Sequence, residues 1–316
     1  MDARRRLFVR APLAAQRNLR GRRVVVTGAA PGSIGFETAA ALASWGAEVT
    51  VTTRSNPQRL AARFREALPA QSGSVDVQLL DLASAGSVAH FARAYAERHD
   101  RLDVLVNNAG IHLDLLSQWR EPRCIDDHEI HWRTNYLGTM QLTNALLPLL
   151  LRSAAQTCDA RIVNVVSMLH TRGRNEFLFT PITPYNSWVA YGTSKLALVH
   201  ATFELQRHHA AAGLQAYCLH PGAVFSNIAD KGLSGNPRLQ AIRNLFAPIE
   251  RQFLLTPKEG AQTSLYCATQ PALAGGRYFQ RCAASSASTE ADDRRVADRL
   301  RAETQLAIAC LPVLDA

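Results

Sequence analysis

Short runs of β-branched residues alternate with longer stretches rich in alanine and leucine from residue 23 onward, and this alternation limits the possible folds severely. The apolar runs predict strands at 24–27, 48–53, 75–80, 103–107, 161–166 and 214–219. The stretches between them predict helices at 36–45, 58–68, 87–98, 129–151 and 190–209. Strands that are apolar throughout are typical of a parallel sheet covered on both faces. We therefore predict the α/β class, a single doubly wound parallel sheet with helices on both faces, whose ligands bind beyond the carboxyl ends of the strands.

The chain is expected to hold one domain with an extension at each end. Its 316 residues would suit one large domain or two small ones, but no linker or repeat interrupts the alternation. We assign residues 1–20 to a basic arm, 21–282 to the α/β domain and 283–316 to a peripheral tail with a helix near 289–308. The Pro/Gly-rich stretch 221–257 is expected to be an insertion over the ligand crevice.

The charge and the cysteines indicate the kind of partner and compartment. The net charge is +9, and much of the excess lies in the N-terminal residues Arg4, Arg5, Arg6, Arg10, Arg17, Arg20, Arg22 and Arg23. A solvated extension is favoured over docking to lipid or nucleic acid, so no nucleic-acid partner is expected. The six cysteines are scattered singly, which indicates a reducing, cytoplasmic setting. No uncharged run approaches the ~18 apolar residues needed to cross a bilayer, so no transmembrane segment is expected.

A glycine-rich loop joins the first predicted strand to the first predicted helix. It contains Gly28, Gly32, Ser33, Ile34 and Gly35. Such glycines let the backbone approach a pyrophosphate, and the following helix N-terminus offers free N–H groups, although an ordinary tight turn would also use glycine.

The second predicted strand ends at Arg54, where an NAD-specific protein of this kind usually carries an acid. Arg54 can bind a 2′-phosphate through a forked contact, which favours NADP(H) over NAD(H). A solvated loop arginine is the alternative.

A tyrosine and a lysine four residues apart share one face of a predicted helix, namely Tyr191 and Lys195. A neighbouring ammonium favours the phenolate of a tyrosine, whose ordinary pKa is near ~10, so the pair can act as a general acid/base. Ser167 ends a predicted strand, where its hydroxyl can orient a carbonyl. Asn135 lies early in a predicted helix. Each residue alone would be interpreted as a surface, turn or capping residue.

Together these motifs resemble the short-chain dehydrogenase/reductase family, which has a Rossmann fold. The resemblance runs in order over 21–279 and rests on the loop 27–35, Asp81-Leu82, Asn107-Asn108-Ala109-Gly110, Asn135, Ser167, Tyr191 with Lys195, and Pro221-Gly222. It implies hydride transfer between NADP(H) and a small-molecule alcohol or carbonyl, in a homodimer or homotetramer.

The resemblance also implies a role for each matching residue. Tyr191 would be the acid/base, Lys195 would bind the nicotinamide ribose and lower the pKa of the tyrosine, Ser167 would orient the carbonyl, and Asn135 would support a proton-relay water. Asp81 would meet the adenine and Asn107 the adenosine ribose region. Further cofactor contacts are implied for Leu82, Asn108, Ala109, Gly110, Pro221, Gly222, Val224 and Ser226.

A narrower resemblance is to the retinol dehydrogenase and WW-domain oxidoreductase branch, whose members mostly use NADP(H) on lipophilic substrates. It rests on Asn135-Tyr136-Leu137-Gly138, the strand 161–167 followed by His170, Tyr191-Gly192-Thr193-Ser194-Lys195, 259–264 and 276–279. The glycine loop is one residue longer than usual and resembles that of fungal-type fatty acid synthase ketoreductases. A β-ketoacyl thioester reductase therefore stays open as an alternative. A second alternative is a non-catalytic NADP(H)-binding scaffold, as some relatives of this fold are.

Three other groups of residues carry side chains that a functional site could use. A metal site at Cys124, His128 and His131 is disfavoured because their acidic surroundings are typical of a loop that enters a helix. His208-His209 is expected at a helix end. Four aromatic residues between Ser167 and Tyr191 could form a lipophilic substrate wall or a loop packed on itself: Phe177, Phe179, Tyr185 and Trp188.

Overall fold

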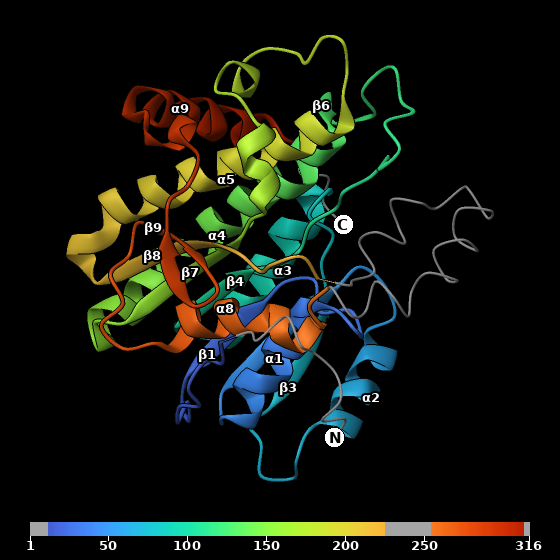
Figure 1. Ribbon diagram of the computed structural model, residues 1–316. Coiled ribbons are helices and arrows are strands. Elements are labelled where there is room, and N and C mark those ends of the chain that lie inside the picture. The colour runs from blue at the N-terminus through green and yellow to red at the C-terminus, as the bar shows by residue number, and fades with distance from the viewer. Residues whose placement is uncertain (1–11, 225–253, 313–316) are drawn as a thin grey trace.

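The computed structural model describes residues 12–224 and 254–312, which are built around an eight-stranded sheet (Figure 1). In spatial order its strands are β10 (Ala283–Ser285), β9 (Arg277–Gln280), β8 (Leu214–His220), β7 (Ala160–Val165), β4 (Val104–Asn107), β1 (Arg23–Val26), β2 (Glu48–Thr53) and β3 (Val75–Leu79). Every neighbouring pair is parallel except β9 and β10. The predicted doubly wound sheet is confirmed, with two further strands, β9 and the antiparallel edge strand β10.

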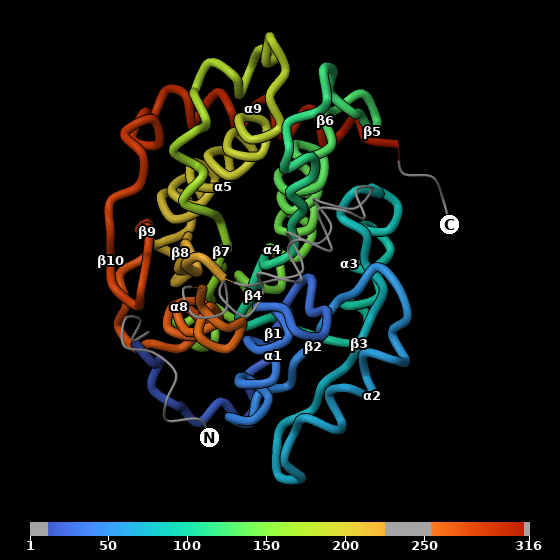
Figure 2. Tube along the Cα trace, turned by 45° about the vertical axis from the view of Figure 1, so that its right-hand side comes forward, coloured from blue at the N-terminus to red at the C-terminus, as the bar shows by residue number. Residues whose placement is uncertain are grey.

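Helices cover both faces of this sheet, as the two views show (Figures 1 and 2). Successive residues of a strand face opposite layers. Val24 and Val26 pack in one core with α1 (Ile34–Ser44), α2 (Pro57–Ala67) and α8 (Pro257–Thr269). Val25 packs in the other core with α3 (Ala85–Arg98), α4 (Gly138–Thr157) and α5 (Ser187–His209). The two-sided burial explains why the central strand β1 is apolar from Val24 to Val26.

The shorter elements connect the layers. They are the hairpin strands β5 (Cys124–Ile125) and β6 (His128–Glu129), the π-helix η1 (Trp132–Leu137), and the 3₁₀ helices η2 (Met168–Arg172), η3 (Glu176–Leu178), η4 (Ala210–Ala212) and η5 (Thr289–Asp292).

The helix predicted at 129–151 was wrong at its start. Asp126 and Asp127 both have positive φ, of 50° and 59°, which is the geometry of a two-residue hairpin turn between β5 and β6. The chain then forms the π-helix η1 before α4 begins at Gly138. Hairpin turns of this kind usually contain glycine. The Asp-Asp turn has none, so this hairpin could not be predicted from the sequence.

The N-terminal arm and the C-terminal tail both contact the domain. Ala14 N donates to Gln262 Oε1 and Leu19 N donates to Trp45 O, so residues 12–20 lie against α8 and the end of α1. Arg4, Arg5, Arg6 and Arg10 lie outside the described residues. The sheet continues beyond the boundary expected at residue 282 into β10.

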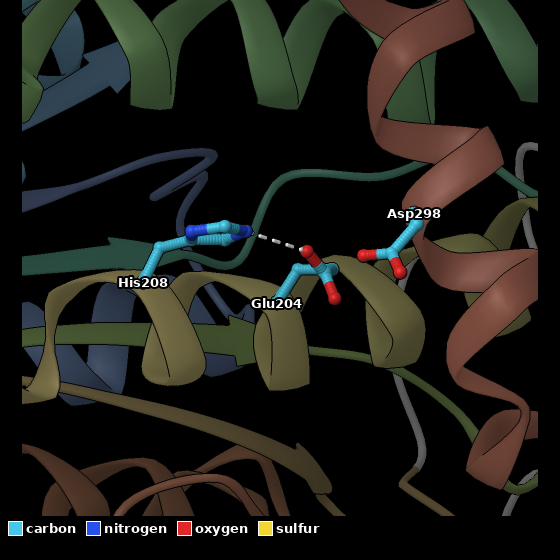
Figure 3. A group of neighbouring side chains, drawn as sticks. All are labelled: Glu204, His208 and Asp298. Atoms are coloured by element: carbon cyan, nitrogen blue, oxygen red, sulfur yellow. Dashed lines mark hydrogen bonds and ion pairs between the residues drawn. The ribbon is translucent and has the colours of Figure 1, made fainter.

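The tail contains α9 (Arg294–Cys310), which packs on α5 (Figure 1). Figure 3 shows the polar part of this contact, where His208 Nε2 lies 3.0 Å from Glu204 Oε2 and Asp298 approaches from α9. Arg207 pairs with both carboxylates, and Arg301 lies 3.7 Å from Glu204. Because two guanidinium groups already neutralise these acids, we interpret the group as an ion-pair cluster that fastens α9 rather than as a cation site.

Within 12–224 and 254–312, none of the helices has the length and apolar character needed to cross a membrane.

Candidate active site

A pocket of about 430 Å³ lies at the carboxyl ends of the central strands. The elements that reach it are distant in sequence and adjacent in the sheet, as a doubly wound topology requires. Its lining includes many of the residues predicted from sequence: Gly28, Ser33, Ile34, Arg54, Asp81, Leu82, Asn108, Ala109, Gly110, Ser167, Tyr191, Lys195, Pro221, Gly222 and Val224.

The glycine loop is shaped by positive backbone angles and by one asparagine. Gly28 has φ +72°, and a Cβ on it would lie 2.8 Å from Ala109 Cα. A Cβ on Gly35 would lie 2.4 Å from Asn108 Nδ2. That Nδ2 donates to Thr27 O at 2.8 Å and to Gly28 O at 3.2 Å. Asn108 therefore braces the loop, and both glycines are needed for the close approach of these backbones.

The loop leads into the N-terminus of α1, where Ser33 Oγ accepts from Phe36 N at 3.2 Å. The first amides of the helix remain available to an anion, and the helix dipole favours negative charge there. Arg54 is exposed on the rim of the same pocket and makes no ion pair with any described residue. A glycine cradle that a Cβ would fill, a helix N-terminus and a free guanidinium together fit a phosphorylated dinucleotide.

Tyr191 and Lys195 project from α5 into the interior end of this pocket. The Lys195 Nζ lies 5.8 Å from the centroid of the Tyr191 ring and donates to Val165 O at 3.1 Å. Ser167 follows β7 and lines the same pocket, and its hydroxyl is near enough to the Tyr191 phenol to lower the pKa of that group. The three residues thus form one cluster in which a substrate oxygen could meet two hydroxyl groups.

Burial dominates the protonation of this pair. Burial raises the pKa of Tyr191 to about 12, and the nearby Ser167 hydroxyl offsets only part of that increase. Burial likewise lowers the pKa of Lys195 to about 8. For the chain by itself, desolvation is therefore the larger effect on the Tyr191 phenol and the Ser167 hydroxyl the smaller.

Asn135 lies behind the pocket in the π-helix. Its Oδ1 accepts from Ile111 N at 2.8 Å, and its Nδ2 donates to Ile111 O at 2.9 Å and to Ser194 Oγ at 3.2 Å. A Cβ on Gly110 would lie 3.3 Å from Asn135 Oδ1 and 3.2 Å from Lys195 Nζ. Asn135 therefore holds the backbone after β4 against the helix that carries Tyr191 and Lys195.

Some predicted residues lie elsewhere. Asn107 is 3% exposed and donates to Thr143 Oγ1 and Asn164 Oδ1, so its side chain braces β4 inside the core and not beside a ribose. Gly32 and Gly35 shape the loop without lining the pocket. Ser226 and the rest of 225–253 lie outside the described residues.

The aromatic residues between Ser167 and Tyr191 pack on the protein and do not line this pocket. Tyr185 Oη donates to Glu129 Oε1 at 3.0 Å, Trp188 Nε1 donates to Leu115 O at 3.1 Å, and Phe179 lies under the Arg299 guanidinium. His131, a member of the disfavoured metal site, has both ring nitrogens engaged, with Glu129 and with Leu113 N.

Two histidines in the pocket were missed by the sequence analysis. His112 is stacked on Tyr191 with centroids 4.1 Å apart and an interplanar angle of 12°. Burial, with the charges of His131 and Lys195, lowers the pKa of His112 to about 3. Burial lowers the pKa of His220 to about 4. Their positions, just after Gly110 and just before Pro221, were the available signal, but a lone histidine carries little information.

Comparison with known proteins identifies the class that this fold and pocket define. Residues 22–235 match the short chain dehydrogenase family. The chain therefore belongs to the short-chain dehydrogenase/reductase family of oxidoreductases, whose members bind a nicotinamide dinucleotide.

Two similar proteins indicate the branch of the family to which the chain is related. Dehydrogenase/reductase SDR family member 13 of Bos taurus is 38% identical over 294 residues, which are 92% of this chain and 74% of that protein. Retinol dehydrogenase 12 of Homo sapiens is 34% identical over 299 residues, 94% of this chain and 89% of that protein. The predicted resemblance to the retinol dehydrogenase branch is confirmed.

Solved structures show the same architecture. A putative uncharacterized protein from Mycobacterium paratuberculosis superposes with a TM-score of 0.67 at 30% identity, over 95% of this chain and 97% of that one. The NADP active-site complex of RhlG from Pseudomonas aeruginosa gives a TM-score of 0.60 at 27% identity, over 83% of this chain and 95% of that one.

Proposed function

We propose that this chain is an NADP(H)-dependent oxidoreductase that interconverts an alcohol and a carbonyl group on a lipophilic small molecule. The observation that carries the proposal is the cluster of Ser167, Tyr191 and buried Lys195 in one pocket with the glycine loop and Arg54. A scaffold that only bound the dinucleotide would not need all three polar groups at the inner end of that pocket.

The bound dinucleotide would supply or accept a hydride. The residues of the chain then have separable tasks. Ser167 Oγ orients the substrate oxygen, and Tyr191 Oη gives that oxygen a proton during reduction or takes one during oxidation. Lys195 carries positive charge beside the phenol, which favours the phenolate at the moment the proton leaves. Asn135 keeps Ile111, and with it the floor of the pocket, in place.

The surroundings of the pocket support a lipophilic substrate. Met168 directly follows Ser167 and is 57% exposed, while Leu116 adjoins the lining residue Leu115 and is 42% exposed. Large apolar side chains exposed beside a pocket gain from contact with an apolar ligand.

Arg54→Ala is expected to weaken NADPH binding by about 10- to 100-fold while changing NADH binding by less than about twofold. The reason is that a forked guanidinium contact to the 2′-phosphate is charge-assisted and worth about 1.5–3 kcal/mol. Nicotinamide fluorescence during parallel titrations with NADPH and NADH measures both constants.

Arg59→Ala is the matched control for the Arg54 variant, because Arg59 is an exposed arginine of α2 outside the pocket lining. Equal affinity of the unaltered protein for the two dinucleotides would contradict the NADP(H) assignment. Failure to bind either dinucleotide would contradict the proposed function as a whole.

A further inference from the structure

His170 bridges the end of β7 to the C-terminal tail through both of its ring nitrogens. Ser288 N donates to His170 Nε2 at 2.9 Å, and His170 Nδ1 lies 2.7 Å from Ser167 O. A backbone N–H can only donate, so Nε2 must accept, and the single proton of a neutral imidazole is therefore on Nδ1. The Nδ1–H then donates to the carbonyl of Ser167.

The surroundings of His170 fix this arrangement. The side chain is 2% exposed and packs against Tyr278 of β9, with ring centroids 5.0 Å apart. Burial lowers the pKa of His170 even though its bond to Ser167 favours the charged form, so the ring is neutral near pH 7 and Nε2 is free to accept. The Ser167 carbonyl also accepts from His170 N at 3.1 Å, which gives it two donors from the same residue.

The tail is fastened at a second point close by. Glu290 Oε2 accepts from Asn175 N at 2.7 Å, and Glu290 O accepts from Asn175 Nδ2 at 2.8 Å. The segment from η2 to η3, which follows Ser167, is thus anchored to residues 288–290 and not only to its own neighbours in the sequence.

We propose that the C-terminal tail positions the catalytic serine, with the N–H of Ser288 orienting His170 and the Nδ1–H of His170 orienting the backbone of Ser167. His170 and Ser288 are positioning residues in this scheme and touch neither substrate nor cofactor. The inference rests on the proposed function, because it takes Ser167 as the group that orients the substrate oxygen. It makes the tail part of the active-site structure, whereas the sequence suggested a peripheral extension.

Ser288→Pro tests the first contact with little backbone change. Ser288 already has φ −57°, close to the angle that proline imposes, and the substitution removes the N–H that His170 accepts. It also removes the hydroxyl that caps η5, so Ser288→Ala is the matched variant, which loses the hydroxyl and keeps the N–H. We expect kcat to fall about 10- to 100-fold further in Ser288→Pro than in Ser288→Ala, because small displacements of a reacting group are costly.

His170→Phe tests the second contact. Phenylalanine keeps a flat ring against Tyr278 and lacks both nitrogens. We expect a loss of kcat similar to that in Ser288→Pro, an NADPH dissociation constant within about twofold of the unaltered protein, and no further loss when both changes are combined, because both break one chain of contacts. Losses that multiply in the double variant, or a Ser288→Pro variant no worse than Ser288→Ala, would overturn the proposal.

The tautomer of His170 gives a measurement that does not need turnover. Nitrogen NMR of the imidazole groups, with the His170 signals identified by their absence in His170→Phe, should show the proton on Nδ1. A proton on Nε2 would overturn the proposal even in an active enzyme. An unaltered protein that binds NADPH but reduces no carbonyl would contradict the proposed function, while the NMR result would still test the contacts from Ser288 N through His170 to the Ser167 carbonyl.

Discussion

Tyr191→Phe is expected to lower kcat/KM for any confirmed carbonyl substrate by about 10²- to 10⁴-fold, the range usual for loss of a positioned general acid. The ring that stacks on His112 is kept, so the pocket keeps its shape and NADPH should bind with unchanged affinity. Steady-state kinetics of carbonyl reduction, followed by NADPH absorbance, measure the first quantity, and fluorescence titration measures the second.

Tyr185→Phe is a suitable control for Tyr191→Phe, because it also removes one tyrosine hydroxyl, but one that donates to Glu129 outside the pocket. We expect its kcat/KM to change by less than about threefold. If Tyr191→Phe retained turnover within that same range, Tyr191 could not be the acid/base, and the assignment of the cluster would have to be abandoned.

Lys195→Met is expected to abolish turnover and at the same time to stabilise the fold. The Lys195 side chain is 3% exposed, and burial lowers its pKa from 10.5 to about 8. At about 1.36 kcal/mol for each pKa unit, the buried charge costs up to roughly 3 kcal/mol at pH 7, and methionine fills a similar space without it. Thermal or urea unfolding at pH 7 measures the gain.

The pH dependence of this gain has a definite sign. Below pH 8 the lysine is charged in both the folded and the unfolded chain, so the full cost is present. As the pH rises from about 8 to 10.5 the folded chain loses the proton first, the unfolded state binds more protons, and the unaltered protein becomes more stable. The advantage of Lys195→Met should therefore shrink across that range.

Lys258→Met, at an exposed position of α8, is the control for charge removal, and its unfolding free energy should change by less than about 0.5 kcal/mol. A Lys195→Met variant that is less stable than the unaltered protein at pH 7 would show that the ammonium makes stabilising contacts that outweigh its burial.

Much of the fold could be predicted because its signals are local. The apolar strands and the helices between them give a period and a length that only a covered parallel sheet satisfies. Edge elements gave no such signal. The four residues of β9 and three of β10 are too short to show a period, and α8 follows a stretch that was interpreted as an insertion, although Thr256 and Glu259 form a capping box at its start.

The site residues likewise divide into those with a local sequence signal and those without one. Residues within motifs, such as Gly28, Tyr191 and Lys195, were predictable because a fixed spacing carries them into the pocket. His112 was not, because its importance comes from its stacking on Tyr191, nearly eighty residues away in the sequence.

The sequence by itself determined the class of the fold, the family and the polar groups at the inner end of the pocket, since periodicity, glycine spacing and the Tyr-to-Lys interval are properties of neighbouring residues. Only the tertiary structure decided the pKa values of those groups and the contacts that hold them in place. Burial, which depends on every element packed around a side chain, sets the pKa values of Tyr191 and Lys195. The contact between Ser288 and His170 joins residues 118 positions apart, and a hydrogen bond over that separation leaves no local pattern from which it could be inferred.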